Sequence, residues 1–272
     1  MPAMTERPAA AKDPIVLAID TATPQVSVAL AGPAGPIAAL AVAGGRRHGE
    51  LLVPAIDTLC QMSETSLAHV SVIAVDVGPG LFTGLRVGVS TARALVSALG
   101  VRGLGLTSLE ILAGAHHRES RSVVAVIDAR RGEVFWARFR PGPDGLRPTA
   151  PAAVASPAAL AAALAEATPG AWAERGEPAL VVGDGALRYG EALAGVPGVV
   201  LGGPDDAHPS AAVAARLAAA RLSSLIRTDW APCPEGGGSD GLEPLYLREP
   251  DVRIGWASRA PVPARPPRGG DG

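Results

Sequence analysis

The sequence predicts an α/β protein built from two similar lobes. Residues 70–77 form an apolar run rich in β-branched side chains, which is typical of a buried strand, and helical periodicity follows up to Leu99. Residues 18–31 align without gaps with residues 126–139. In both segments an apolar strand ends in Asp, a short polar turn follows, and an alternating strand begins. The repeat indicates two lobes that open with the same strand–turn–strand unit.

The first lobe is expected to cover residues 14–107, after an Ala- and Pro-rich tail at residues 1–13 that we expect to be disordered. Alternation and apolar runs predict strands at 15–19, 25–31 and 37–42. A helix is expected over 50–62. Pro54 must lie in its first turn, with a start near Val53, or bend it. The strand at 70–77 leads into a Gly-rich loop, and Thr83 is a candidate N-cap for the next helix.

The second lobe is expected to cover residues 108–248. Its predicted elements are a helix over 108–115 that begins near Thr107, a Pro- and Gly-rich loop at 141–151, a helix over 156–167, a strand at 179–182 and an amphipathic helix over 210–226. A short strand at 104–106 precedes them. Residues 249–272 read as a flexible tail rich in Pro and Arg.

Composition limits the function classes. The 272-residue chain is 48% hydrophobic, which is ample for a core, and its net charge of −2 with a pI near 6.2 argues against strong nucleic-acid binding by this chain alone. The two cysteines form neither a metal-binding spacing nor a disulfide framework. With no run of about 20 apolar residues and no signal peptide, we expect a cytoplasmic protein that does not contact membranes.

The turn after the first strand is a candidate phosphate site. Thr21 and Thr23 offer hydroxyl and backbone donors, and Asp20 could place a metal ion or water. Gly78 and Gly80 belong to a strand–loop–helix of the kind that binds anions in α/β proteins.

Two observations oppose that interpretation. The equivalent turn of the second lobe carries Arg130 and Arg131, where a phosphate-binding loop prefers small residues. Both Asp side chains could instead cap tight turns, and the Gly-rich loop could serve only to pack a helix closely on a sheet.

Two helices carry more apolar surface than one sheet can cover. The helix over 84–99 has a single narrow polar stripe, formed by Arg86, Ser90, Arg93 and Ser97, and the helix over 50–62 is similar. A second domain or a second molecule could cover the remaining apolar surface. Alternatively, both helices could be buried inside the domain. The candidate interface residues are Leu52, Ile56, Leu59, Leu85, Val89, Ala92, Val96 and Leu99.

No metal site is expected. His48-Gly-Glu50 offers one histidine, and Leu52 stands where a second would complete a metal-binding pair. His116 and His117 are adjacent, so their side chains diverge. A catalytic zinc usually has three protein ligands, which argues against a zinc peptidase. His48 is expected to cap the helix N-terminus or to lie in an interface.

Five motifs in this order carry a family resemblance: Ile19-Asp-Thr-Ala-Thr23, Arg46-Arg-His-Gly-Glu-Leu-Leu-Val-Pro54, Gly78-Pro-Gly-Leu-Phe-Thr-Gly-Leu-Arg-Val-Gly88, Asp128-Ala-Arg-Arg-Gly-Glu133 and Pro244-Leu-Tyr-Leu-Arg248. Over residues 15–248 the chain resembles the TsaB (YeaZ) family, a partner subunit in bacterial synthesis of threonylcarbamoyladenosine (t6A) in tRNA. The resemblance implies an actin-like (ASKHA) fold with mixed sheets, flanking helices and an internal duplication.

The resemblance also implies partners. TsaD is the paralogue that transfers the threonylcarbamoyl group to adenosine 37 of tRNA, and TsaE is a small ATPase of the same system. A TsaB-like chain scaffolds TsaD through two helices of the first lobe, which map here onto residues 49–62 and 84–99. It implies tRNA contact only through the complex, no tightly bound cofactor, weak ATP or ADP binding at the cleft or complex interface, and a homodimer when TsaD is absent.

Three classes of function follow: a non-catalytic assembly subunit, an ATP-dependent kinase or hydrolase of the actin-like class, and a zinc peptidase. The second needs small, Gly-rich phosphate turns in both lobes, and the third needs metal ligands that the sequence lacks. Measurable ATP turnover or peptide cleavage by the purified chain would favour one of the latter two.

Overall fold

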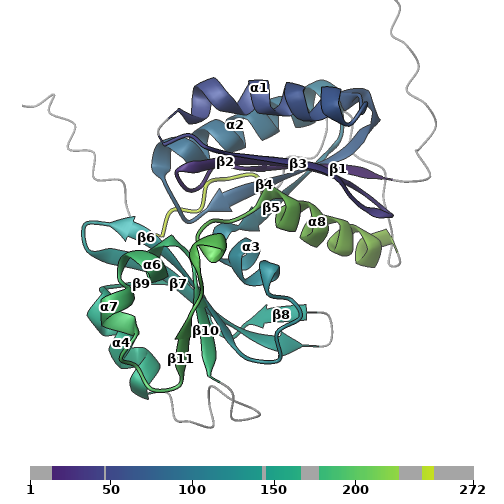
Figure 1. Cartoon of the computed structure of the whole chain (residues 1–272). Helices are drawn as coiled ribbons and strands as arrows, with labels where there is room; N and C mark the ends of the chain where they lie inside the picture. Colours follow the sequence, from purple (N-terminus) through teal and green to yellow (C-terminus); the bar gives the residue numbers. More distant parts are fainter. Residues whose placement is uncertain (1–13, 46, 143–144, 167–177, 227–240, 248–272) are drawn as a thin grey trace, which may run out of the picture.

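The computed structural model describes residues 14–45, 47–142, 145–166, 178–226 and 241–247. They form two lobes, each built on one β-sheet, with the first lobe above the second in Figure 1. Both sheets are mixed and carry helices, so the predicted α/β class is confirmed.

The first sheet contains five strands in the order β3-β2-β1-β4-β5. Their bounds are β1 (Ile15–Asp20), β2 (Gln25–Gly32), β3 (Gly35–Ala43), β4 (Val70–Gly78) and β5 (Arg102–Thr107). β1 pairs antiparallel with β2 and parallel with β4, and β2 continues antiparallel into β3. Because β1 and β4 are buried on both faces, they read as continuous apolar runs in the sequence.

Helices cover both faces of this sheet. On one face lie α1 (His48–Met62) and α2 (Phe82–Leu99); the 3₁₀ turn η1 (Leu67–His69) leads into β4. On the other face lies α8 (Ala211–Ile226), which packs over β1 and β2, with α3 (Ser108–Ala115) beside it. Although residues 211–226 were assigned to the second lobe, they are packed on the first.

The second sheet has the order β11-β10-β6-β7-β8, with β9 pairing β7. Its strands are β6 (Val123–Arg130), β7 (Glu133–Gly142), β8 (Gly145–Pro148), β9 (Ala153–Ala155), β10 (Ala179–Val182) and β11 (Val199–Leu201). Among the described residues, the helices of this lobe are α4 (Pro157–Glu166), α6 (Asp184–Arg188) and α7 (Gly190–Leu193), and the 3₁₀ turn η2 (Pro204–Asp206) follows β11.

The two sheets repeat one topology. In each, the first strand pairs antiparallel with the second, the second antiparallel with the third, and the first parallel with the fourth, which pairs parallel with the fifth. The equivalent series are β1–β5 and β6, β7, β8, β10, β11. The internal repeat seen in the sequence is therefore a duplication of the whole sheet.

Several local expectations need correction. α2 begins at Phe82 after Leu81, and no side chain caps it, so Thr83 is not the N-cap. α1 begins at His48 and includes Pro54, so a start near Val53 is wrong. Residues 141–151 include the end of β7 and all of β8, which pair as a hairpin, so this segment is not simply a loop. Thr107 does cap α3, by accepting a hydrogen bond from the Glu110 N–H.

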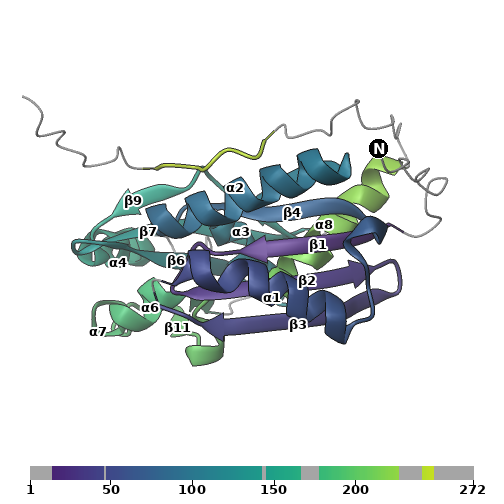
Figure 2. The same ribbon diagram turned by 90° about the horizontal axis from the view of Figure 1, so that it is seen from above.

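The last described segment, residues 241–247, returns across the first lobe, as Figure 2 shows in yellow beside α2. Leu242 is fully buried in the core below α1 and α2, and the Leu245 N–H donates to the Val77 carbonyl (2.7 Å). Leu247 reaches the core of the second lobe. This segment therefore ties the two lobes together. None of the helices described is both long and apolar enough to cross a membrane.

Candidate functional site

The turn after β1 is held closed by the Asp20 side chain. One of its oxygens, Oδ1, accepts the Ala22 N–H (2.9 Å), two residues on, and Oδ2 accepts the Ser27 hydroxyl (3.3 Å). The Ser27 hydroxyl in turn accepts the Ala211 N–H at the start of α8 (2.9 Å). Asp20 thus caps a tight turn and links it to a helix on the far face of the sheet.

The N-terminal part of α2 covers this turn at very short range. The Thr21 hydroxyl donates to the Gly84 carbonyl (2.8 Å), and the Leu81 N–H donates to the Ala22 carbonyl (2.7 Å). A Cβ atom at Gly84 would lie 2.0 Å from the Thr21 carbonyl oxygen, and one at Gly80 would lie 2.3 Å from that of Ala22. The glycines are thus required because the helix and turn backbones touch.

His48 fixes the turn from the other helix. It is the first residue of α1, it is 3% exposed, and its Nε2 lies 2.7 Å from the Thr23 carbonyl oxygen, which makes it the donor. His48 is therefore neither the helix cap, which is Arg47, nor an exposed interface residue. The sequence around His48 gives no indication of this contact, because its partner lies 25 residues away.

The structure brings together the five residues predicted to bind phosphate. Asp20, Thr21 and Thr23 are buried, Gly78 has a φ of 106° at the end of β4, and Gly80 touches Ala22. Their polar groups are engaged by the chain itself, which confirms the alternative that Asp20 caps a tight turn beneath a closely packed helix. Binding of a nucleotide in the cleft stays a prediction.

A pair of buried carboxyl groups lies beneath the turn. Asp76 on β4 is fully buried like Asp20, and its Oδ1 accepts the Ser108 hydroxyl (2.6 Å) and the Gly78 N–H (2.7 Å). Burial raises the pKa of Asp76 to about 6. Burial, followed by the charge of Asp76, raises the pKa of Asp20 well above its ordinary value. Both shifts favour the protonated form of these two neighbouring carboxyl groups.

The second lobe repeats this Asp-headed turn with arginine side chains around it. Asp128 at the end of β6 accepts the Arg130 N–H (2.9 Å), two residues on, and its other oxygen faces the guanidinium groups of Arg130 (3.1 Å) and Arg188 (3.4 Å). Both Arg130 and Arg131 have positive φ, at 65° and 56°. Arg130 and Arg188 thus face the Asp128 carboxylate, and Asp128 caps the turn as the alternative interpretation expected.

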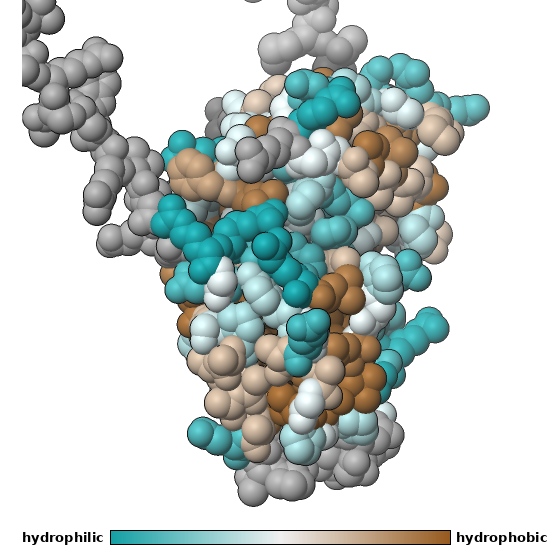
Figure 3. Space-filling view, turned by 60° about the vertical axis from the view of Figure 1, so that its left-hand side comes forward, coloured by the Kyte–Doolittle hydropathy of each residue, from teal (hydrophilic) through white to brown (hydrophobic). Residues whose placement is uncertain are grey.

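Helix α6, which has Gly183 as its N-cap, packs closely against this second turn. A Cβ atom at Gly183 would lie 2.0 Å from the Val126 carbonyl oxygen, and Asp184 of α6 accepts the Asp128 N–H (2.9 Å). Burial raises the pKa of Asp184. In Figure 3, hydrophilic residues form a band between the apolar groups of the upper and lower lobes.

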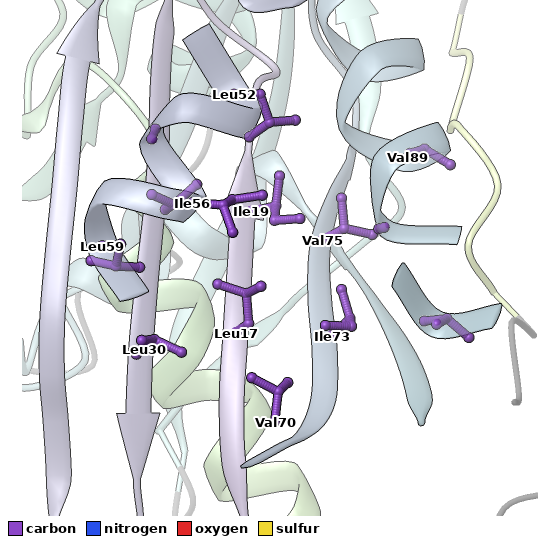
Figure 4. Close-up of a cluster of buried hydrophobic side chains, with 14 of the residues drawn as sticks. Leu17, Ile19, Leu30, Leu52, Ile56, Leu59, Val70, Ile73, Val75 and Val89 are labelled. Atoms are coloured by element: carbon purple, nitrogen blue, oxygen red, sulfur yellow. The ribbon is translucent and has the colours of Figure 1, made fainter. Parts of the chain in front are cut away.

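The apolar side chains predicted to form an interface lie in the core of the protomer. Figure 4 shows Leu52, Ile56 and Leu59 of α1 and Val89 of α2 in one apolar cluster with side chains of the first sheet. Seven of the eight are no more than 5% exposed, and only Leu99 is half-buried: Leu52, Ile56, Leu59, Leu85, Val89, Ala92, Val96 and Leu99. The premise that they are surplus surface is therefore wrong, because the sheet and Leu242 cover them.

What the two helices expose is mostly polar or small. α2 presents Arg86, Ser90, Arg93 and Ser97, as expected from its polar stripe, together with Ala94 and Ala98. α1 presents two large hydrophobic side chains, Val53 (61% exposed) and Met62 (77%). Contact of these helices with a partner stays a prediction, and it now concerns these outer faces.

Sequence reasoning missed the junction made by residues 241–247. Arg86 stacks on the Phe82 ring (3.8 Å to its centroid), Phe82 contacts the Tyr246 ring, and the Arg86 Nε donates to the Tyr246 hydroxyl (3.3 Å). Beneath it is a largely apolar cavity of about 550 Å³, lined among others by Pro79, Leu109, Ala137, Phe139, Leu245 and Leu247. The Pro244–Arg248 motif was the one available signal. No group of three or more potential metal ligands occurs in the described part of the chain.

Two lobes with one repeated sheet order, each with an Asp-capped turn under a glycine-led helix, define an actin-like protein. Residues 41–226 match the family model of TsaD, tRNA N6-adenosine threonylcarbamoyltransferase. YeaZ from Pseudomonas aeruginosa superimposes with a TM-score of 0.68 at 27% identity, covering 86% of this chain and all of that one.

Two relatives show different extents of similarity. A chain from Mycobacterium tuberculosis described only as uncharacterized is 34% identical over 88% of this chain and 93% of its own length. The tRNA threonylcarbamoyladenosine biosynthesis protein TsaB of Escherichia coli is 35% identical over 48% of this chain and 57% of its own length. The chain belongs to the family that the TsaD model describes and, within it, to the TsaB (YeaZ) family.

Proposed function

We propose that this chain is a non-catalytic subunit of the bacterial t6A synthase, which binds and activates TsaD. The names of the TsaB relatives support a role in t6A synthesis. The observation that carries the non-catalytic part is the filled phosphate turn. The Thr21 hydroxyl donates to the Gly84 carbonyl, and both Asp20 oxygens accept hydrogen bonds from groups of the same chain.

The closed turn disfavours an actin-like kinase or hydrolase. Such an enzyme must present backbone N–H groups and an acidic side chain to a phosphate. Here α2 would have to move away from Thr21 and Ala22 before a phosphate could enter, and the second turn offers Arg130 and Arg131 in strained backbone positions. ATP turnover by the purified chain above a blank would favour the enzyme instead.

TsaD is proposed to dock on the outer faces of α1 and α2. Ala94 and Ala98 lie one helical turn apart and are exposed, and such small side chains let a partner helix approach closely. Val53 and Met62 supply apolar contact area on α1. Arg86 and Arg93 add positive charge along the same helix, for which acidic side chains on TsaD would be complementary.

The remaining partners are those that the family resemblance implies. TsaE is proposed to join the complex of this chain with TsaD, and tRNA to contact the complex through TsaD. Weak ATP or ADP binding is proposed at the cleft or at the surface between subunits, and not inside the filled turn.

The experiment combines this chain with TsaD from the same genome. Ala98→Glu introduces a charge on the outer face of α2, and Ala220→Glu introduces the same charge on α8, at the opposite face of the sheet. Both positions are exposed, so both variants should fold. We expect wild type and Ala220→Glu to form a heterodimer by size-exclusion chromatography with light scattering, and Ala98→Glu to lose at least about tenfold in affinity. Equal binding by all three would place the TsaD contact elsewhere.

A further inference from the structure

Two fully buried carboxyl groups lie side by side at the end of the first sheet. Asp20 and Asp76, called the acid pair below, directly follow Ile19 and Val75, which are paired on the parallel strands β1 and β4. Ile19 and Val75 face the core under α1 and α2. Because side chains alternate along a strand, the acid pair faces the opposite side of the sheet, which α3 and α8 cover. The two carboxyl groups are within hydrogen-bonding reach of each other.

The acid pair has no cationic partner among the described residues. The groups that bind the two carboxyls are hydroxyls and backbone N–H groups. Oδ2 of Asp76 is buried and accepts no hydrogen bond. A buried oxygen without a donor costs free energy, and two adjacent carboxyls in a dry site cannot both be ionised at low cost. One proton held between Asp20 and Asp76 removes both penalties.

The acid pair is also connected to both passages of the chain between the lobes. The chain enters the second lobe through α3, which packs on the cores of both lobes, and it returns to the first lobe at α8. The hydroxyl of Ser108, the first residue of α3, donates to Asp76 (2.6 Å). Asp20 is connected to the N–H of Ala211, the first residue of α8, through the Ser27 hydroxyl. The starts of both helices are therefore fixed on the first sheet through these two acids.

We propose that Asp20 and Asp76 share one proton and form a pH-sensitive switch at the junction of the two lobes. With the proton in place, the acid pair holds the starts of α3 and α8 in one arrangement on the first sheet. Loss of the proton to solvent leaves two like charges in a site without a cation, so the carboxyls separate and their hydrogen bonds to Ser108 and Ser27 rearrange. The orientation of the second lobe relative to the first changes as a result.

Other titratable groups near these passages are tied to different partners. His48 of α1 binds the Thr23 carbonyl and neither carboxyl of the acid pair. His116, which follows α3, lies 3.3 Å from Asp206 of η2, and this contact is an ion pair only when the imidazole is protonated. Because it joins the same two passages, the contact of His116 with Asp206 needs its own control. The remaining elements present uncharged groups to the acid pair: Ser27 of β2, Leu106 of β5, Ser108 of α3 and Ala211 of α8.

The switch does not rest on the proposed function, and its test measures the separation of the lobes in the full chain. Spin labels are attached through Thr58→Cys on α1 and Ala192→Cys on α7, both at exposed positions, after Cys60 and Cys233 have been replaced by Ser. Double electron–electron resonance then gives the distance between the labels at pH values on either side of 6. Burial raises the pKa of Asp76 to about 6, so the proton is lost as pH rises through this range.

We expect the distance between the labels to shift with pH when both acids are present. Asp76→Asn should keep the low-pH distance at every pH, because an amide has no proton to lose in this range. His116→Gln is the control and should shift as the parent does. Ser108→Ala, which removes the connection to α3, should reduce the shift while urea unfolding still shows the pH dependence of the acid pair.

A distance that does not change with pH in the labelled parent would overturn the proposal. So would a shift that persists unchanged in Asp76→Asn. Loss of the shift in His116→Gln, with retention in Asp76→Asn, would overturn it in favour of the contact between His116 and Asp206.

Discussion

The buried pair of Asp20 and Asp76 makes the stability of this protein depend on pH in an unusual direction. The most informative perturbation is Asp76→Asn. An Asn side chain has the shape of a protonated Asp, its Oδ1 can keep the hydrogen bonds from Ser108 and the Gly78 N–H, and its amide can donate toward Asp20. The variant thus removes the titration and retains the contacts.

The sign and size follow from the raised pKa. Burial raises the pKa of Asp76 from its ordinary value of 3.8 to about 6, so between these values the folded protein holds a proton that the unfolded chain has lost. The contribution of this group is fully present below about pH 4 and is lost as pH rises through about 6. That difference corresponds to about 3 kcal/mol of unfolding free energy. Asp20, whose pKa is also raised, acts in the same direction.

The assay is urea unfolding of wild type and Asp76→Asn at several pH values between 4.5 and 8. We expect the unfolding free energy of the variant, relative to wild type, to increase by about 2–3 kcal/mol over this range. Asp205→Asn, at an exposed carboxylate, should track wild type. A stability difference that is independent of pH, or one that shifts in favour of wild type as pH rises, would refute the raised pKa of Asp76.

Three further predictions concern packing. Gly84→Ala should cost at least about 2 kcal/mol because its Cβ would lie 2.0 Å from the Thr21 carbonyl oxygen, whereas Gly49→Ala, with open space around it, should stabilise α1 by about 0.5–1 kcal/mol; urea unfolding distinguishes them. Val96→Arg buries a charge in the core and should abolish the folded circular dichroism spectrum, and a folded Val96→Arg protein would show that this face is accessible. Leu242→Ala should lower the unfolding free energy by about 2–5 kcal/mol, measured by urea unfolding. A loss below about 1 kcal/mol would mean that residues 241–247 do not stabilise the first lobe.

The sequence predicted the secondary structure of both lobes well because the signals are local. Apolar runs marked β1 and β4, the Asp-headed repeat marked β1–β2 and β6–β7, and Thr107 marked the start of α3. The duplication was visible because the repeated unit carries a geometric requirement, an Asp that accepts the N–H two residues later in both lobes.

What the sequence could not show depends on contacts between distant segments. The apolar excess of α1 and α2 suggested a partner, but residues 241–247 return to complete the core, and periodicity contains no information about that return. The turn predicted to bind phosphate is closed for the same reason, since the Thr21 hydroxyl donates to a carbonyl 63 residues away. Asp76 lay inside an apolar run and gave no hint of its partner Asp20.

The central claim, that this chain acts in t6A synthesis by binding TsaD and without chemistry of its own, is tested most directly by reconstitution. Purified TsaD and its companion proteins from the same genome would be incubated with ATP, threonine, bicarbonate and unmodified tRNA, with and without this chain, and t6A measured by mass spectrometry. We predict t6A formation that requires this chain and persists in Thr21→Val, because the Thr21 hydroxyl already donates to the Gly84 carbonyl. Equal t6A formation without this chain would contradict the account.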